Sequence, residues 1–579
     1  MKKCMKTIAL IVLCSVCLPV AAANRFIIMY KLSKSQEVFL ANKSGADKYN
    51  AEEQMRICSL RDSLREKEDS LQLAVSFVDD VSVVSVSVKG DGSGLVLLDA
   101  DLNEEQTKQF IKKVEQDSKV ESIQEDTIMT LSSGINSNYQ WDMVNKGEFL
   151  KEAGRIGDKF TKAWKLLKDY GHVPGEDVVI AVLDTGYVPH SNYLRNLQPL
   201  NGKAGVFGYK FISDCRQSGE CPSCTSGADA SNDIHSKYEE DGIDQGDFLN
   251  IQDIGCLYSN VPTSLRPSPS ASSWHGSHVI ELIVAGGYSG TNVDHLTGGA
   301  YGAKIIPVRV TGKGGGYVSD IIDGMRWAAG LPVINIDGSD VPINQNPVDI
   351  INMSIVARSQ FGCDPAYQRT IDQLVQNGVL IVVAAGNDQV NITDTNLASC
   401  RGVISVAAKR PTNKLAYYSN FGNVTIAASG ESLSVDDQLA RICSAVWPSD
   451  NGFVAQSSGV NVQGTSMATP QVSVAIANLV GILKKQGKSY TSNDIIALLQ
   501  QNAMKYDNCH DANRCATGYA LDMEKAVKSA LGIDDTFLVK AWSTTLNVAS
   551  YVITFIAGGV VVYVYNRLYP TSYLHPHSE

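Results

Sequence analysis

Three short motifs, far apart in the sequence, carry the side chains that can turn a serine hydroxyl into a nucleophile. Asp184 follows an apolar run at 178–183, His275 opens a second apolar segment, and Ser466 lies in Gly-Thr-Ser-Met-Ala. A serine hydroxyl attacks a carbonyl carbon at neutral pH only when a base, often histidine, accepts its proton. A carboxylate beside the histidine holds its tautomer and stabilises the imidazolium. The sequence therefore predicts a catalytic triad of Asp184, His275 and Ser466.

Other chemistries fit parts of this pattern. Asp184-Thr185-Gly186 is also typical of aspartic proteases, but those enzymes need two carboxylates that share a proton. The chain has no second Asp-Thr-Gly or Asp-Ser-Gly. A lipase or esterase is disfavoured by the chain order Asp, His, Ser and by the lack of Gly-x-Ser-x-Gly at Ser466. Taken alone, Ser466 would be interpreted as a helix N-cap.

Apolar segments predict the elements that position these groups. Buried strands are expected at 178–183, 304–310, 348–353, 379–384 and 403–407, with helices at 319–329 and 367–377. This alternation predicts a parallel sheet with helices on both faces, and catalytic groups at the carboxyl ends of strands. A buried helix is expected to begin near Ser466, because Pro470 is tolerated only near a helix start.

With a fourth motif, Val-Ala-Ala-Gly-Asn at 383–387, the chain resembles the subtilase family of serine proteases over residues 156–531. Segments 272–278, 324–332 and 401–406 resemble its disulfide-containing secreted bacterial branch. The resemblance implies a subtilisin-like α/β catalytic domain, assigned to 136–531. It also implies that the Asn387 amide and the Ser466 backbone N–H bind the oxyanion of the reaction.

The same resemblance implies that a protein or peptide substrate adds as a strand between two backbone segments. The residues expected to bind it are Gly314, Gly315, Gly316, Ser354, Ile355, Val356, Ala384 and Gly386. Where the family has Leu-Gly-Gly, this chain has Ile355-Val356-Ala357, so a branched side chain replaces glycine. We expect a reshaped S1 pocket that prefers small side chains. A catalytically impaired binding module with the subtilisin fold is the alternative, with Val356 obstructing the cleft, but the complete triad argues against it.

Further departures from the family lie beside the base and the nucleophile. They are Ile280-Glu281 after His275, and Gln471 with Ser473-Val474 after Ser466. Larger residues in tightly packed helices predict altered core packing rather than another chemical class. Lys313 followed by three glycines is not a phosphate-binding loop, because no Ser or Thr follows the lysine.

Thirteen cysteines favour an oxidising compartment. The resemblance implies a Cys363–Cys400 bridge. Cys509 and Cys515, which flank a tight polar loop, are predicted to form another disulfide. The polar insertion at 211–273 carries Cys215, Cys221, Cys224 and Cys256; disulfides are favoured there over a redox pair or a zinc site with His235. The acidic run at 239–247 lacks the pattern of a calcium-binding hand and is expected to be a solvated loop. No metal or other cofactor is predicted, and structural calcium is left open.

The segment before the catalytic domain predicts export and maturation. Basic residues, an apolar run at 7–20 and Ala21-Ala22-Ala23 are typical of a signal peptide over 1–23, cleaved after Ala23. Residues 24–135 alternate strand and helix patterns and resemble the inhibitory propeptide of subtilases, so the chain's own propeptide is expected as an inhibitor. A permanent interaction domain is the alternative. Processing is expected between Leu131 and Asn138.

The last part of the chain predicts a membrane anchor. A linker at 532–545 precedes twenty residues without a charged side chain at 546–565, and a short tail follows at 566–579. Twenty helical residues span about 30 Å, the thickness of a hydrocarbon core. A core or amphipathic helix is the alternative, as is an anchor that is later removed. The net charge of −11 and the lack of a long basic run argue against nucleic acid as a partner.

Overall fold

The computed structural model describes 23–31, 81–131, 134–135, 158–189, 193–213, 238–247, 251–257, 272–285, 298–335, 338–356, 362–430, 442–447 and 454–533, with single positions 263, 266, 270 and 359. The chain divides into two compact units, Met1–Val527 and Lys528–Glu579. The predicted anchor, the tail, most of the signal peptide and Cys215, Cys221 and Cys224 lie outside the described residues. Apart from the last four residues of a helix that ends at Leu531, the described helices and strands lie in the first unit.

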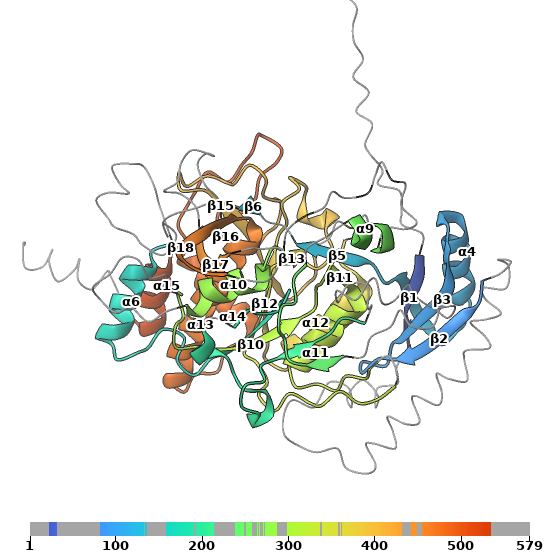
Figure 1. Ribbon diagram of the computed structural model, residues 1–579. Helices are drawn as coiled ribbons and strands as arrows, with labels where there is room; N and C mark the ends of the chain where they lie inside the picture. The colour runs from blue at the N-terminus through green and yellow to red at the C-terminus, as the bar shows by residue number, and fades with distance from the viewer. Residues whose placement is uncertain are drawn as a thin grey trace, which may run out of the picture. The chain divides into compact units, whose positions relative to one another are not determined.

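An eight-stranded sheet forms the centre of the catalytic region, in the order β16-β15-β14-β12-β7-β10-β8-β9 (Figure 1). The strands are β7 Val179–Asp184, β8 Tyr209–Lys210, β9 Glu239–Glu240, β10 Lys304–Arg309, β12 Ile350–Met353, β14 Leu380–Ala384, β15 Val403–Lys409 and β16 Ile426–Ser429. Every neighbouring pair is parallel except β8 with β9. The predicted parallel sheet is therefore confirmed.

Helices cover both faces of this sheet. α11 (Val318–Ala328) and α12 (Pro365–Gln376) share one core cluster with alternate strand residues such as Leu183, Met353 and Val383. Successive strand residues point to opposite faces, so the other set faces α10 (His275–Val284) and α13 (Thr465–Lys485), which pack against each other and the strands. This two-sided cover is what the apolar patterns predict.

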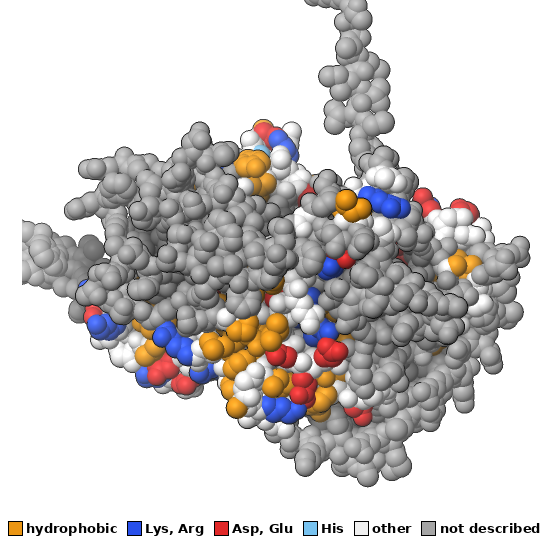
Figure 2. All heavy atoms as spheres, viewed as in Figure 1, with side chains coloured by type: hydrophobic (Ala, Val, Ile, Leu, Met, Phe, Trp, Pro, Cys, Tyr) orange, Lys and Arg blue, Asp and Glu red, His pale blue; other side chains and the backbone are white. Residues whose placement is uncertain are grey.

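The remaining elements of the catalytic region are short or lie at its edges. The helices are α6 Phe160–Asp169, α9 Ile251–Leu257, α14 Ser492–Gln501 and α15 Met523–Leu531, with short 3-10 turns at Leu194–Asn196, Leu200–Gly202 and Ile392–Asp394. A small sheet joins β17 Ile442–Trp447, β18 Val454–Gln463 and β6 Gly134–Ile135. Acidic, basic and hydrophobic side chains are interspersed on the face drawn in Figure 2.

Helix α13 is a core helix. Among the described residues it alone is long and apolar enough to cross a membrane, but 94% of the relevant window is buried inside the fold. It therefore says nothing about the predicted anchor at 546–565. The helix begins at Thr465, as expected, after Gly464 with φ of 144°.

The preceding segment folds as a small α+β structure. Its strands β1 Ala23–Tyr30, β2 Val83–Val88, β3 Gly94–Leu102 and β4 Val120–Glu125 form a sheet in the order β2-β3-β1-β4, with α4 Glu104–Val114 packed on it. Phe26 and Phe110 meet at 4.8 Å in its core. Asn103 and Gln106 form a capping box that satisfies two backbone N–H groups where α4 begins. Strands and a helix therefore alternate along the described part of this range, as the sequence patterns predict. A further charged helix that the sequence predicts at 51–74 lies outside the described residues.

Candidate active site

Asp184 and His275 meet at the carboxyl end of the sheet. Asp184 is the last residue of β7, and His275 is the first residue of α10. His275 Nδ1 lies 2.7 Å from Asp184 Oδ1 and 2.9 Å from Oδ2. Both side chains are buried, at 1% and 0% exposure. Sequence analysis predicts this pair, and the structure brings it together.

The environment of His275 strengthens it as a base. Burial lowers the pKa of the imidazole, but the charge and the hydrogen bond of Asp184 outweigh burial and leave it raised. Its Nε2 atom has no hydrogen-bond partner within the described residues. Nδ1 is therefore bonded to the carboxylate, and Nε2 is the ring nitrogen that can accept a proton.

His278, the second histidine of this motif, has the opposite environment. It is 1% exposed. Burial, and then the neighbouring His275, lower its pKa to about 3, so it is neutral at ordinary pH. Of the two histidines in this motif, only His275 is bonded to Asp184 Oδ1 and Oδ2.

Thr185 links the pair to a carboxylate that sequence analysis missed. Its backbone N–H donates to Asp184 Oδ1 at 2.8 Å, and its hydroxyl donates to Asp244 Oδ2 at 2.6 Å. The same hydroxyl accepts from the Gly276 N–H at 3.0 Å, beside His275. A Cβ on Gly276 would stand 2.2 Å from the Gly186 carbonyl oxygen, so the two motifs approach closely only because glycine lies there.

The expectation of a solvated acidic loop at 239–247 is wrong for Asp244. Glu239 and Glu240 are exposed, but Asp244 is only 4% exposed. Burial raises its pKa to about 7, against the opposing charge of Arg309. No local signal separates Asp244 from its exposed neighbours, because its burial depends on contact with Thr185, 59 residues earlier.

Ser466 lies in the first turn of α13 and is tied to Ser354. The Ser466 hydroxyl donates to the Ser354 carbonyl at 3.0 Å, and the Ser354 hydroxyl donates to the Ser466 carbonyl at 2.8 Å. The second bond has a local cause: the helical partner of the Ser466 carbonyl would be the N–H of Pro470, which proline lacks. Asn352 Nδ2 donates to the Ser354 hydroxyl at 3.2 Å.

Asn387 is oriented by the turn that precedes α13. Its Oδ1 accepts the Thr465 N–H at 2.9 Å, so the Nδ2 end of the amide is the donor end. The Thr465 hydroxyl accepts the Gly386 N–H at 3.1 Å. Gly386 has φ of +104°, and a Cβ there would stand 2.3 Å from Asn420 Nδ2. Asn387 therefore lies next to the nucleophile candidate, as sequence analysis predicts.

The expected substrate strands hold part of the chain itself. β5 (Ile128–Leu131) lies between β11 (Gly316–Tyr317) and β13 (Ile355–Val356) in one antiparallel sheet (Figure 1). Gly316 pairs with Met129 and Tyr317 with Ile128 on one side. Ile355 pairs with Leu131 and Val356 with Thr130 on the other.

Glycine is needed where β5 approaches. A Cβ on Gly315 would stand 2.2 Å from the Met129 carbonyl oxygen, closer than any real contact. Val356 is 6% exposed, and its Cγ1 would stand 3.4 Å from a Cβ on Gly386. The branched side chain therefore lies against Gly386. Its effect on the S1 pocket stays a prediction.

A second contact that sequence analysis missed holds the Met129 side chain. Tyr367 in α12 donates its hydroxyl to Met129 Sδ at 3.0 Å, and both side chains are fully buried. The helical pattern at 367–377 predicts that Tyr367 faces a core. It cannot show that the core includes a residue 238 positions earlier.

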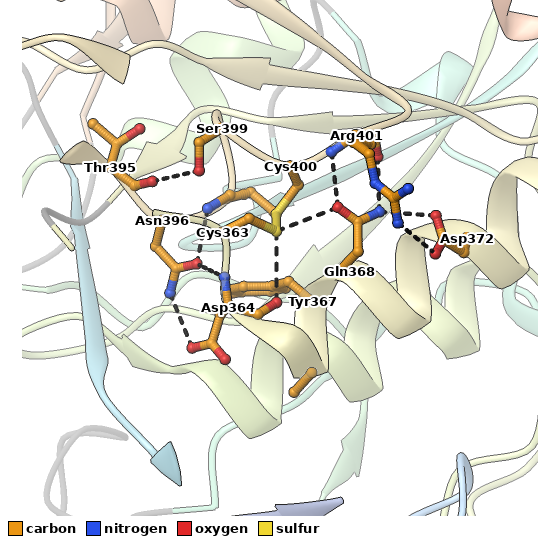
Figure 3. Close-up of a disulfide and its surroundings, with 12 residues drawn as sticks. Cys363, Asp364, Tyr367, Gln368, Asp372, Thr395, Asn396, Ser399, Cys400 and Arg401 are labelled. Carbon is orange, nitrogen blue, oxygen red and sulfur yellow. Dashed lines mark hydrogen bonds and ion pairs between the residues drawn. A yellow bond between two sulfur atoms is a disulfide. The ribbon is translucent and has the colours of Figure 1, made fainter. Parts of the chain in front are cut away.

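Both predicted disulfides between described cysteines are present. Cys363 bonds to Cys400, and Cys509 bonds to Cys515. Figure 3 shows the first bridge between the start of α12 and the loop before β15, where Gln368 Nε2 donates to the Arg401 carbonyl at 3.1 Å. Within the described residues, no group of three or more His, Cys, Asp or Glu side chains could hold a metal ion.

Comparisons with known proteins agree with this geometry. The family model described as the subtilase family matches residues 175–527. The extracellular basic protease of Dichelobacter nodosus is 36% identical over 380 residues, covering 66% of this chain and 54% of that protein. The extracellular protease of Xanthomonas campestris pv. campestris is 31% identical over 392 residues, covering 67% and 56%.

A solved protease from Pseudoalteromonas arctica has the same fold. It is 30% identical with a TM-score of 0.52, and the match covers 68% of this chain and 99% of that structure. The chain spans about half the length of the two curated relatives, 54% and 56%.

Proposed function

Because this chain belongs to the subtilase family, matched over residues 175–527, we propose that it is an exported serine endopeptidase acting through Asp184, His275 and Ser466. The observation that carries the proposal is β5, an extended peptide held between β11 and β13 next to Ser466. A peptide chain in this position is arranged as a protease substrate would be. Export is supported by the two relatives described as extracellular.

Acylation would begin when the Ser466 hydroxyl turns from the Ser354 carbonyl toward His275. His275 Nε2 takes the proton as Ser466 Oγ attacks the carbonyl carbon of the scissile peptide. Asp184, bonded to Nδ1, stabilises the imidazolium. The imidazolium then protonates the leaving amine, the C–N bond breaks, and an acyl ester remains on Ser466. Water, deprotonated by His275, hydrolyses that ester and restores the hydroxyl.

The oxyanion of each tetrahedral intermediate would lie at the beginning of α13. Asn387 Nδ2 and the Ser466 backbone N–H are the proposed donors, and the helix macrodipole favours negative charge there. The Thr465 N–H fixes the amide by holding Asn387 Oδ1 at 2.9 Å. Donors fixed before reaction stabilise developing charge without reorganising.

The segment assigned to 24–135 is proposed to act as an inhibitory propeptide, and the whole chain as a zymogen that processes itself by a cut a few residues before 135. The bond to be cut lies between Leu131, the end of β5, and Gly134, the start of β6. Leu131 pairs with Ile355, and the next residue back along that strand, Ser354, is bonded to Ser466. Because the two strands are antiparallel, continuing this register by one position would match Ser132 to Ser354. We therefore propose that the bond after Ser132 is cut. A serine before the cut fits the expected preference for small side chains.

Buried polar contacts support the inhibitory role. Asp126 Oδ1 accepts the Ser319 N–H at 2.8 Å where α11 begins. Lys89 forms a buried ion pair with Asp323 of α11 at 2.7 Å. These contacts join residues before the proposed cut to α11 on the other side of it, so cutting the chain does not by itself break them. The propeptide would therefore stay bound after the first cut, until it is degraded or released.

A membrane tether through residues 546–565, with the catalytic domain on the non-cytoplasmic side, is the remaining part of the proposal. Release of the protein from membranes by detergent but not by salt or carbonate would support it. Recovery of the full-length chain from the medium without detergent would refute it.

Labelling with a serine-directed phosphonate tests the catalytic proposal. The wild type should gain one phosphonyl group, mapped to the peptide containing Ser466, and His275→Ala should label far more slowly because the base is gone. If matured wild-type protein, without its propeptide, shows no labelling, the impaired binding module is the better interpretation. Hydrolysis of esters without any hydrolysis of peptides would instead favour an esterase.

A further inference from the structure

A buried ion pair lies beside the substrate strand but outside the triad. Lys313 Nζ is 2.8 Å from Asp253 Oδ2, and the two side chains are 4% and 1% exposed. Asp253 belongs to α9, which comes from the polar insertion at 211–273. Taking two charges out of water is costly, so a pair this deeply buried fixes its partners once formed.

Lys313 occupies the tip of a tight turn. The Gly312 N–H donates to the Gly315 carbonyl at 2.8 Å, and the Gly315 N–H donates to the Gly312 carbonyl at 3.1 Å. Only Lys313 and Gly314 lie between these paired residues, as in a two-residue hairpin. Gly314 has φ of +79° and Gly315 of +120°, values that favour glycine.

This turn leads directly into β11, which pairs with Ile128 and Met129. Three consecutive glycines have a large conformational entropy, so the backbone alone specifies their geometry weakly. Lys313 is the residue of this turn with a long side chain, and that side chain ends on α9. The ion pair thus restrains the turn through a residue outside it.

We propose that Asp253 is a positioning residue for long peptide substrates, acting through Lys313 to hold β11 ready for pairing. The proposal rests on the proposed protease function. With cleavage after residue 132, β13 pairs with the second and third residues before the cut, and β11 with the fourth and fifth. Helix α9 would therefore favour substrates that extend at least five residues before the cut.

Two p-nitroanilide substrates separate these strands. The long one, acetyl-Ile-Met-Thr-Leu-Ser-p-nitroanilide, copies residues 128–132. The short one, acetyl-Thr-Leu-Ser-p-nitroanilide, keeps the residues that pair with β13 and lacks those that pair with β11. For Asp253→Asn, the ratio of kcat/KM for the long substrate to that for the short one should fall about ten-fold, the factor for ~1.4 kcal/mol of lost binding. The fall should arise from KM.

Two further variants keep the result decisive. The double variant Asp253→Asn/Lys313→Met removes both charges of this pair, so neither is left buried without the other. It should fold even if Asp253→Asn does not, and it should show the same fall in the ratio. Asp522→Asn removes the carboxylate of another ion pair, that with Lys159, whose side chains are 0% and 22% exposed. It should lower thermal stability without changing the ratio.

The outcomes distinguish the two proposals. If the matured wild type hydrolyses neither substrate, the protease function itself is refuted. If the wild type prefers the long substrate and both Asp253 variants keep that preference, the positioning role is refuted. An equal loss on both substrates would also overturn it, because a general structural defect does not discriminate by substrate length.

Discussion

The bond between the Ser354 hydroxyl and the Ser466 carbonyl gives the most detailed prediction. Proline at 470 removes the N–H that would otherwise bond the Ser466 carbonyl, and the Ser354 hydroxyl takes its place at 2.8 Å. The same hydroxyl accepts from Asn352 Nδ2 at 3.2 Å. Asn352, Ser354 and Ser466 are all buried, at 0–1% exposure. Ser354→Ala therefore leaves two buried polar groups without this partner.

The magnitude follows from those two groups. Each buried polar group left unsatisfied costs about 1–3 kcal/mol, and the longer Asn352 bond is the weaker of the two. Ser354→Ala should therefore destabilise the protein by about 2–4 kcal/mol. In a Pro470→Ala background, the restored backbone N–H can bond the Ser466 carbonyl, so the same substitution should cost about 1–2 kcal/mol. The coupling between the two positions is the difference, about 1–2 kcal/mol.

Urea unfolding followed by tryptophan fluorescence measures this cycle. All four proteins should carry Ser466→Ala, which prevents self-digestion and leaves the carbonyl in place. Ser354→Thr, which keeps a hydroxyl, is the matched control for loss of the donor. If Ser354→Ala costs the same with Pro470 in place as it does in the Pro470→Ala background, the account of why Ser354 is bonded to Ser466 is refuted.

Three further predictions concern catalysis and binding. Asn387→Ala should lower kcat by roughly 10²–10³-fold, as in subtilisin, with little change in KM; a loss below ten-fold would exclude the amide as an oxyanion donor. The raised pKa of His275 means that the imidazolium persists to higher pH than usual, so kcat/KM should fall as pH drops through that raised pKa. Asp184→Asn should move this limb to lower pH besides slowing catalysis, and an unmoved limb would assign it to another group. Tyr367→Phe removes the donor to Met129 Sδ. Because a neutral hydrogen bond contributes ~0.5–1 kcal/mol, the preference for Met over Leu at the fourth residue before the cut should weaken about two- to five-fold. An unchanged Met/Leu ratio in competition assays would refute this role.

Local sequence patterns were sufficient to predict the side chains that meet at the carboxyl end of the sheet. Asp184 ends a buried strand, and parallel strands bring such carboxyl ends to one edge of the sheet. His275 opens an apolar helix in a recognisable motif. The beginning of α13 near Ser466 could also be predicted from a short stretch, because an apolar run there has a proline near its start and basic residues at its end. These features depend on short stretches of sequence.

Contacts between distant segments could not be predicted where no motif marks the residues that make them. Asp244 resembles its exposed acidic neighbours, and only the approach of Thr185 distinguishes it. Ser354 was expected to bind substrate through its backbone, whereas its hydroxyl also replaces the N–H that Pro470 lacks. The pairing of β5 with β11 and β13 is the basis of the proposed cleavage site, and strand register across such distances has no sequence signature.

The most direct test of the central claim is the intact mass of the exported segment 24–531, produced as wild type and as Ser466→Ala. The account predicts that wild type separates into a propeptide ending at Ser132 and a catalytic domain, while Ser466→Ala stays full length. If both proteins remain uncut, or both are cut at the same bond, Ser466 is not the nucleophile of its own maturation and the zymogen account is contradicted.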